Sequence, residues 1–433
     1  MHAPEGAHTL AVIGQGYVGL PVAQAASATG LKVYGLEIAP GRAEALNKGI
    51  SHVDDISNED IERMLQSGYT ATNDASVIRQ ANIVVICVPT PLDEGGGPDL
   101  SAVEAASASI GTNLTPGTTV VLESTTYPGT TEDVVLPILE QTSGMQHVPP
   151  GSASEVGFYL AFSPERIDPG SKNWTIVNTP KLVGGITPEA TEKATKFYQR
   201  FIETVVPLSG TKEAETAKLL ENTYRHVNIA LVNEMARFCH DLGIDIWEVI
   251  RGASTKPFGF QKFTPGPGVG GHCIPIDPNY LSFQVKKTLG YQFRFVELAQ
   301  EINNSMPSYV VGRIADLLNE QGKALNGAQV LLLGVTYKPD IADQRESPAT
   351  PLAEVLATKN ARISFHDPLV EDWKLNGRTI HRAPDLYAAA SQSDIVILLQ
   401  NHSSYNIEKL TSVSPIFLNT RGKSPGQPNS HSL

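Results

Sequence analysis

A glycine pattern near the start of the chain, Gly14-x-Gly16-x-x-Gly19, constrains the fold more than any other feature of the sequence. It follows the apolar run 10–13 and opens a segment, about 20–27, whose composition favours a helix. In such a unit the first glycine makes a tight turn, the second lets a pyrophosphate approach, and the third packs helix against strand. The alternative is a packing turn without a ligand. We expect a dinucleotide-binding unit contacting its cofactor through Gly14, Gly16, Tyr17, Val18 and Gly19.

The residue at the end of the next apolar run indicates which cofactor is bound. Residues 31–36 end at Glu37, which lies 18 residues (37 minus 19) beyond Gly19. A carboxylate at this place accepts hydrogen bonds from both ribose hydroxyls and repels a 2′-phosphate, which favours NAD over NADP. Arg42 lies nearby and is a further cofactor-binding candidate, so it keeps the NADP alternative open.

Strand and helix patterns alternate through the first half of the chain. Further apolar runs at 83–88, 118–122 and 158–162 are separated by helical segments at 58–66 and 101–110. This alternation predicts a parallel sheet covered on both faces.

The pattern changes after about residue 207. One long helix is expected over 211–241, and more helix through 250 and over 295–321. A second set of apolar runs then follows, in which 362–365 again ends beside an acid, Asp367. We expect an α/β fold of two Rossmann-like, doubly wound parallel sheets, joined by a long central helix and a helical dimerisation region. The expected domains are 1–207, 208–310 and 311–433, with a frayed tail over 422–433.

Composition narrows the class of protein. A chain of 433 residues is too long for one core. Its net charge of −12 argues against non-specific binding to nucleic acid or anionic membranes. The three cysteines, the absence of a secretory pattern at the N-terminus and the absence of an apolar run of ~20 residues predict a cytoplasmic protein without disulfides or membrane spans.

A single cysteine, Cys273, stands behind the glycine-rich run 266–271. Glycines permit close approach to a ligand, and an accessible thiolate can attack a carbonyl carbon. The alternatives are a buried cysteine or a metal ligand with His272, but no second cysteine lies nearby and no metal is expected. Asp277 either supports the thiolate and a water or caps the following turn. Cys87 and Cys239 are expected in the core.

Polar groups also gather where predicted strands end. Thr90 and Thr125 follow two strands and are expected to line the nicotinamide, although turn chemistry explains them equally well. Glu165 and Arg166 follow a third strand, where the first can activate water and the second can contact a polar ligand; a surface turn is the alternative.

On the long helix, Lys218, Asn222 and Arg225 share one face. They form either a solvated stripe or part of a site in which the lysine exchanges protons with a substrate hydroxyl. Lys338 and Arg345 follow the first strand of the second sheet and are placed to reach phosphates. Their alternative is a loop with internal ion pairs to Asp340 and Asp343.

Together these motifs resemble the UDP-glucose/GDP-mannose dehydrogenase family over nearly the whole chain. The segments that carry the resemblance are GQGYVGLP from Gly14, VPTP from Val88, SPER from Ser163, AKLLEN from Ala217, PGPGVGGHCIPIDP from Pro265 and YKPDIADQRESP from Tyr337. The resemblance implies an NAD-dependent, four-electron oxidation of a sugar C6 alcohol to a carboxylate. A two-electron alcohol dehydrogenase and an NAD-sensing protein without catalysis are the alternatives.

The resemblance also assigns roles to residues. It makes Cys273 the nucleophile, places Lys218 and Asn222 near the substrate C6, and gives Asp277 a role in supporting the thiol and the water. Thr125 matches the threonine near the water and Glu165 the glutamate that assists hydrolysis. Lys338 and Gly271 would contact the substrate, and Arg345 would reach the cofactor.

Two departures point to a subgroup of the family. UDP-glucose members usually carry a second glutamate four residues after the position of Glu165, where this chain has Pro169. The form Glu165-Arg166-Ile167-x-Pro169, together with Arg225, resembles the members that act on UDP-N-acetylhexosamines. Arg166, Ile167 and Arg225 become substrate-binding candidates, UDP-N-acetylglucosamine the leading substrate, UDP-N-acetylmannosamine its rival and UDP-glucose a third option. The product would serve surface polysaccharide synthesis.

Overall fold

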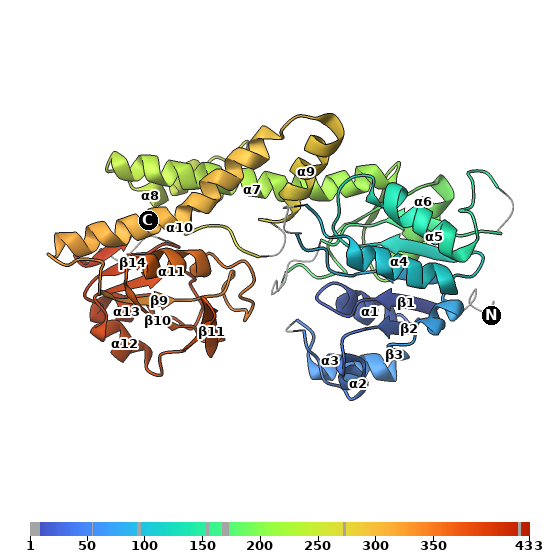
Figure 1. The fold of residues 1–433 in the computed structure, drawn as a ribbon, viewed down its shortest axis with the longest axis horizontal. Coiled ribbons are helices and arrows are strands. Elements are labelled where there is room, and N and C mark those ends of the chain that lie inside the picture. Colours follow the sequence, from blue (N-terminus) through green and yellow to red (C-terminus); the bar gives the residue numbers. More distant parts are fainter. Residues whose placement is uncertain are drawn as a thin grey trace. The chain divides into compact units, whose positions relative to one another are not determined.

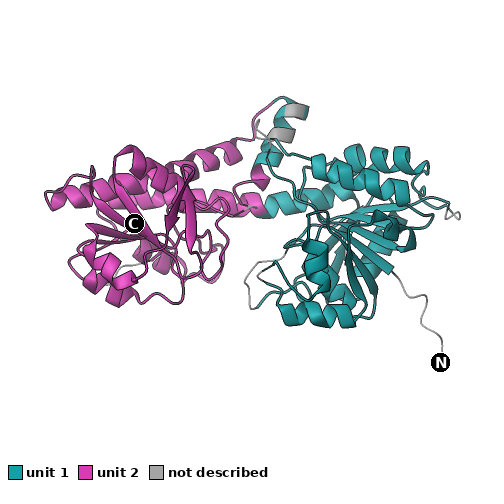
Figure 2. Ribbon diagram, turned by 60° about the horizontal axis from the view of Figure 1, so that its bottom comes forward, with its two compact units in different colours: residues 1–221, 279–290 teal, residues 222–278, 291–433 magenta. Residues whose placement is uncertain are grey.

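The computed structural model describes residues 9–53, 55–92, 97–152, 156–166, 173–271, 274–422 and 426–433. The chain forms two compact units, one of residues 1–221 with 279–290 and one of residues 222–278 with 291–433 (Figure 2). Two helices, α7 (Thr211–Asp241) and α9 (Asp277–Leu289), begin in one unit and end in the other. Each unit is built around its own parallel sheet (Figure 1).

The first unit contains an eight-stranded sheet in the order β3-β2-β1-β4-β5-β6-β7-β8. Neighbouring strands run parallel from β3 to β6, β7 is antiparallel to β6, and β8 is parallel to β7. The strands are β1 (Thr9–Ile13), β2 (Lys32–Leu36), β3 (Tyr69–Thr72), β4 (Ile83–Ile86), β5 (Thr119–Leu122), β6 (Tyr159–Phe162), β7 (Lys181–Gly185) and β8 (Val205–Pro207).

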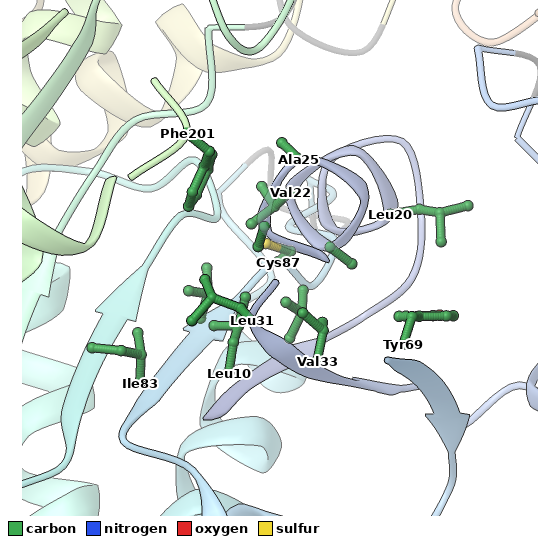
Figure 3. Close-up of a cluster of buried hydrophobic side chains, with 14 of the residues drawn as sticks. Leu10, Leu20, Val22, Ala25, Leu31, Val33, Tyr69, Ile83, Cys87 and Phe201 are labelled. Atoms are coloured by element: carbon green, nitrogen blue, oxygen red, sulfur yellow. The ribbon is translucent and has the colours of Figure 1, made fainter. Parts of the chain in front are cut away.

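Alternate residues of these strands enter two separate cores. Leu10 and Val12 pack in one core with the helices on that face, whereas Ala11 between them packs in the other. Figure 3 shows part of the first core, where α1 lies over the strands. This core contains α1 (Gly19–Ser27), α2 (Arg42–Asn47), α3 (Asn58–Gln66) and α6 (Pro188–Tyr198), and the other contains α4 (Ser101–Asn113) and α5 (Leu136–Ser143). Burial on both faces explains why the strands read as nearly continuous apolar runs.

The second unit repeats this design with a five-stranded parallel sheet in the order β10-β9-β13-β14-β15. Its cores lie on opposite faces, with α10 (Arg294–Glu320) and α11 (Ala349–Thr358) in one and α12 (Leu386–Gln392) and α13 (Ile407–Val413) in the other. The strands are β9 (Gln329–Leu333), β10 (Arg362–His366), β13 (Ile395–Leu398), β14 (Phe417–Asn419) and β15 (Ser430–Ser432), with a hairpin of β11 (Asp372–Leu375) and β12 (Arg378–His381). The unit also contains α8 (Ile246–Ala253).

The predicted fold class is confirmed, including both sheets and the single long helix over 211–241. The expectation of a frayed tail is wrong, because β15 pairs with β14 and Leu433 is buried in the core. The strand β15 was not predicted because its residues are polar and give no apolar pattern. It is held by main-chain hydrogen bonds, which any residue except proline can donate. None of the helices that the structure describes has the length and apolarity needed to cross a bilayer.

Candidate active site

The glycine pattern forms the turn between β1 and α1. Gly14 has φ +88°, and a Cβ there would lie 2.6 Å from the Cys87 carbonyl oxygen. At Gly19 a Cβ would lie 1.9 Å from the Gly14 oxygen, so only glycine lets the helix approach the strand this closely. A Cβ on Gly16 would meet no atom of the described chain within 4 Å. The turn therefore has the tight, packed and open positions that a pyrophosphate-binding loop needs.

Glu37 follows β2 directly and lies beside this turn. Its Oε1 accepts a hydrogen bond from the Ala39 amide at 2.9 Å, and its Oε2 accepts one from the Gln15 amide at 3.3 Å. The Arg42 guanidinium lies 3.9 Å from Oε2. The structure thus brings the predicted pair Glu37 and Arg42 together next to the fingerprint, and the residues fit a dinucleotide with unphosphorylated ribose.

The turns after β4 and β5 are joined by side-chain hydrogen bonds. The Thr90 hydroxyl donates to the Thr125 carbonyl at 2.7 Å, and the Ser124 hydroxyl donates to the Val88 carbonyl at 2.6 Å. The two predicted threonines therefore lie side by side at the carboxyl edge of the sheet. Their neighbour Thr126, which the sequence reasoning missed, is 1% exposed, and its hydroxyl finds no hydrogen-bond partner within the described residues.

The segment after β6 meets the first part of α7. The Lys218 Nζ lies 3.3 Å from Glu165 Oε2, and both side chains are buried, at 6% and 9% exposure. The same ammonium group donates to the Glu165 carbonyl. Arg166 forms an ion pair with Glu221 at 2.7 Å. Neither the solvated stripe nor the surface turn therefore describes Lys218 and Glu165, which form a buried acid–base pair.

A second buried ion pair supports this segment and was missed by the sequence reasoning. Lys181 Nζ lies 3.1 Å from Glu123 Oε1 and donates to the Pro164 carbonyl at 3.3 Å, while the Tyr198 hydroxyl donates to the same Glu123 oxygen. Burial, followed by the Glu123 charge, raises the pKa of Tyr198 well above its usual range, so it remains a donor. A charged residue directly after an apolar run, as at Glu123, was the available signal. Glu123, Glu165, Arg166 and Lys181 line one small cavity.

The start of α7 is fixed to the turn after β5 by Glu215. Its Oε2 accepts a hydrogen bond from the Gly129 amide at 2.6 Å, and its Oε1 accepts bonds from the Thr131 amide at 2.9 Å and hydroxyl at 2.7 Å. Burial raises the pKa of Glu215 to about 7, even though these hydrogen bonds oppose the rise. Glu215 therefore holds the threonine-bearing turn against the helix that carries Lys218.

In the second unit, α7 contributes Asn222 and α9 begins with Asp277. The Asn222 amide donates to Asp277 Oδ2, and the Arg225 guanidinium donates to Asn222 Oδ1. Asn222 and Asp277 are buried, at 1% and 2% exposure. Burial of Asn222 distinguishes it from the solvated stripe that was its alternative, whereas Arg225 on the same predicted face is exposed.

The glycine-rich run packs on the loop that follows β9. Gly271 has φ +88° and donates its amide to the Arg345 carbonyl at 3.3 Å, and a Cβ on it would lie 2.9 Å from the Tyr337 ring. A Cβ on Gly270 would lie 2.7 Å from the Glu346 carbonyl oxygen. The structure therefore joins two motifs that are far apart in the sequence. The neighbouring Cys273 and His272, and also Ile167, lie outside the described residues.

Three basic residues of the second unit lie near the glycine-rich run or on the loop after β9, and the sequence reasoning considered two of them, Lys338 and Arg345. Arg345 pairs with Asp343 in its own loop at 2.6 Å, which is the internal ion pair named as its alternative, and its reach to a cofactor stays a prediction. Lys338 is half-buried in the same loop. Arg421 was not considered in the sequence reasoning; its guanidinium donates to the Leu399 carbonyl at 2.5 Å and would lie 2.7 Å from a Cβ on Gly266. Burial lowers the pKa of Arg421 to about 10, so it remains a cation at neutral pH.

Comparison with known protein families agrees with this geometry. Three domain models of the UDP-glucose/GDP-mannose dehydrogenase family match the chain: the NAD binding domain over residues 8–202, the central domain over 212–305 and the UDP binding domain over 331–422. The Gly14–Gly19 turn and Glu37 therefore lie in an NAD-binding domain, and the Tyr337 loop lies in a UDP-binding domain.

Individual relatives share most of the chain. It is 36% identical to the UDP-N-acetyl-D-glucosamine 6-dehydrogenase of Pseudomonas aeruginosa and 34% identical to the UDP-N-acetyl-D-mannosamine dehydrogenase of Pyrococcus horikoshii, each over 83% of this chain and 83% and 84% of those proteins. The solved structure of the UDP-D-ManNAc dehydrogenase of P. horikoshii superposes with a TM-score of 0.87 over 98% of both chains at 30% identity. With its fold, its dinucleotide turn and its buried acid–base pair, the chain belongs to the UDP-glucose/GDP-mannose dehydrogenase family of NAD-dependent nucleotide-sugar dehydrogenases.

Proposed function

We propose that this protein oxidises the C6 alcohol of UDP-N-acetylglucosamine to the carboxylate, using two NAD and one water per sugar. The observation that carries this proposal is the buried pair of Lys218 and Glu165, 3.3 Å apart. A buried lysine beside a carboxylate can exchange a proton with a substrate hydroxyl, which an exposed lysine does poorly at neutral pH.

The proposed chemistry divides the oxidation between these groups. NAD, which the Gly14–Gly19 turn and Glu37 would hold, would supply the hydride acceptor for each of the two oxidations at C6. Lys218, or a water held by it and Asn222, takes the proton of the C6 hydroxyl as the aldehyde forms. The Cys273 thiolate then adds to the aldehyde carbon, and the hemithioacetal loses the second hydride to leave a thioester. Water, directed by Glu165, Thr125 and Asp277, cleaves the thioester and regenerates the thiol.

Substrate choice rests on the first turn after Glu165 and on α7. Arg166, held by Glu221, and Arg225, held against Asn222, supply cations near the proposed sugar site, with Ile167 in the same stretch. The 36% identity to a UDP-N-acetyl-D-glucosamine enzyme supports the same hexosamine here. UDP-N-acetylmannosamine is the second candidate, because the superposed P. horikoshii structure is named as an enzyme for that sugar. Lys338, Gly271 and Arg421 are proposed contacts of the UDP moiety, and Arg345 is proposed to reach the cofactor.

The test of this proposal is to supply the protein with NAD and, separately, with UDP-N-acetylglucosamine, UDP-N-acetylmannosamine or UDP-glucose, and to measure NADH and uronic acid together. Two NADH per UDP-N-acetylglucosamine, with slow turnover of the other two, is expected. Preference for UDP-N-acetylmannosamine would keep the chemistry and overturn the substrate. One NADH per sugar would overturn the thioester route. Cys273→Ala is expected to abolish acid formation while NAD still binds; acid production by this variant would refute the nucleophile.

The protein is also proposed to act as a homodimer, or a higher homo-oligomer, through α7. Exposed apolar side chains recur along this helix at the spacing of one face: Leu220, Tyr224, Leu231, Met235 and Phe238 are 66%, 45%, 56%, 37% and 53% exposed in the single chain. An apolar stripe of this length is typical of an interface between protein chains. Light scattering should give twice the chain mass, and Leu231→Glu with Met235→Glu should return the protein to the monomer mass.

The three expected domains, 1–207, 208–310 and 311–433, are proposed as the cofactor, central and UDP-sugar domains. The protein is further proposed to work in the cytoplasm and to supply an acidic sugar for surface polysaccharide synthesis. The few cysteines support the first of these proposals; Cys87 and Cys239 are buried and free.

A further inference from the structure

A buried histidine lies beneath the loop that carries Lys338. His402 has no exposed side-chain surface, and neither has Asp367, whose Oδ2 lies 3.1 Å from His402 Nε2. The same Nε2 lies 3.3 Å from the Thr336 hydroxyl. On the other side of the ring, the Asp340 amide donates to Nδ1 at 3.0 Å. His402 therefore bonds the residue two positions before Lys338 and the residue two positions after it.

These partners fix the roles of the two ring nitrogens. The Asp340 amide can only donate, so Nδ1 accepts. Nε2 faces the Asp367 carboxylate and the Thr336 hydroxyl oxygen, to which it can donate. Burial acts to raise the pKa of Asp367, but hydrogen bonds from His402 and from the Leu369 and Val335 amides, together with electrostatic attraction to His402, outweigh it and lower that pKa. The result is a buried carboxylate held by a buried histidine.

Within the part of the chain that the structure describes, hydrogen bonds hold four of the five residues of the Thr336–Asp340 loop, all except Pro339. The Thr336 hydroxyl donates to the Lys338 carbonyl at 2.9 Å, and the Gln400 side chain donates to the Tyr337 carbonyl at 2.5 Å. Asp340 has φ +62°, a left-handed conformation that is unfavourable for residues other than glycine, and the Ser403 amide donates to its carboxylate at 2.8 Å. A loop held this closely through its main chain presents its side chains in one arrangement.

We propose that His402 is a positioning residue of the nucleotide-sugar site. It holds the Thr336–Asp340 loop, through Nδ1 at Asp340 and Nε2 at Thr336, in the conformation that presents Lys338 to the UDP moiety. The proposal rests on the proposed function of Lys338 and adds a residue that does not touch the substrate itself. It predicts that losing His402 weakens nucleotide binding and leaves NAD binding unchanged.

Two substitutions separate the two sides of the ring. His402→Asn places an amide oxygen where Nδ1 lies and can still accept the Asp340 amide. His402→Gln places an amide NH₂ near the position of Nε2 and can still donate to Asp367, but it loses the acceptor for Asp340. His402→Ala loses both. His381→Asn is the matched control, because that histidine is 81% exposed on the β11–β12 hairpin.

The experiment measures the Kd of UDP by calorimetry for the full chain and these variants, with NAD affinity and urea unfolding measured beside it. We expect UDP binding to weaken about tenfold in His402→Ala and His402→Gln, and about threefold or less in His402→Asn, as loss or retention of a buried hydrogen bond predicts. NAD affinity should not change, and KM for the sugar nucleotide should rise while kcat changes little.

Three results would overturn the inference. Equal UDP binding by wild type and all folded His402 variants would remove the positioning role. Rescue of both stability and UDP binding by His402→Gln rather than His402→Asn would make His402 a partner of Asp367 only. Failure of the wild-type chain itself to bind UDP would instead refute the proposed function, and the role of the Lys338 loop with it.

Discussion

The two sheets place an acid at the same position of the same turn, and they use it differently. In the first unit the Gly14 amide donates to the Leu36 carbonyl at 2.9 Å, and Glu37 follows β2. In the second the Gly334 amide donates to the His366 carbonyl at 3.0 Å, and Asp367 follows β10. Gly14 and Gly334 both have positive φ, +88° and +77°. The strand–glycine–strand–acid geometry is therefore shared.

The difference lies in what surrounds each carboxylate. Glu37 accepts one close amide, from Ala39, and a longer bond from Gln15, which leaves lone pairs for the hydroxyls of a ribose. Asp367 accepts amides from Val335 and Leu369 at 2.8 and 2.9 Å and also holds His402. The same turn is thus proposed to serve ligand binding in one unit, and in the other it organises a loop of the chain itself.

The largest expected effect is on stability. Asp367→Ala should lower the free energy of unfolding by about 3 kcal/mol, because the buried Val335 amide, the part-buried Leu369 amide and the buried His402 lose their acceptor. Glu37→Ala should lower it less, by about 1–2 kcal/mol, since it removes the part-buried bond from the Ala39 amide and a single long buried bond, at 3.3 Å, from the Gln15 amide. Urea unfolding followed by circular dichroism measures both, with Asp372→Ala on the exposed hairpin as control. Equal losses at Glu37 and Asp367 would contradict the comparison.

One buried group in each unit, Glu215 and His226, should make stability respond to pH in opposite directions. In the first unit, Glu215 has a folded pKa of about 7 against an ordinary 4.5, so the folded chain binds a proton that the unfolded chain has released between these values. Stability from this group is therefore present below about pH 4.5 and is lost as the pH rises to 7, by roughly 1–3 kcal/mol. Glu215→Gln should flatten this slope, whereas the exposed Glu213→Gln should not. An unchanged slope in Glu215→Gln would contradict the assignment.

In the second unit, burial lowers the pKa of His226 to about 4 from an ordinary 6.5. The unfolded chain then binds the extra proton, so stability falls as the pH decreases from 6.5 to 4, again by roughly 1–3 kcal/mol. His226→Asn, compared with His381→Asn, should remove this acid sensitivity in urea titrations. If both variants keep it, another group carries the acid sensitivity.

The smallest expected effect concerns the affinity for NAD, which tests the proposed role of the Glu37 carboxylate. Glu37→Ala should weaken NAD binding about tenfold, the value of one or two lost hydrogen bonds, and should narrow the preference for NAD over NADP because the repulsive charge is gone. Asp367→Asn, provided that it folds, should leave both cofactor affinities unchanged. Fluorescence titration with the two cofactors measures this, and an unchanged NADP affinity in Glu37→Ala would argue against ribose recognition at this position.

Most of the fold could be predicted from the sequence, because strands buried on both faces leave continuous apolar runs. Six of the strands that the structure describes were missed, namely β3, β7, β8, β11, β12 and β15, and each is short or interrupted by polar residues. For example, β7 begins with the charged Lys181, and β15 is the polar Ser430–Ser432. Lys181 is buried because Glu123, 58 residues earlier in the chain (181 minus 123), neutralises it. Pairing over such a distance has no local signature.

The site shows the same division. Motif spacing singled out Glu37, Glu165 and Lys218 as candidates, since each follows a strand or shares a helix face, and the structure buries all three side chains. It did not single out His402 or Arg421, because their contacts form between loops that meet only in the folded chain. The sequence also left two options for Arg345, and its ion pair with Asp343 depends on the loop conformation.

The course of α7 and α9 has a consequence for how the protein is made. The chain passes between the units after residues 221, 278 and 290, so the first unit receives its last segment, 279–290, only after 57 residues of the second (278 minus 221) have been added. That late segment brings Tyr280, which is 1% exposed and donates its hydroxyl to the Thr90 carbonyl. During translation the Thr90 carbonyl therefore lacks the Tyr280 hydroxyl until the segment 279–290 has been synthesised. A gene fragment that stops at residue 221 encodes a cofactor domain without this contact, and exchanging the whole first unit between relatives requires three junctions, after residues 221, 278 and 290, rather than one.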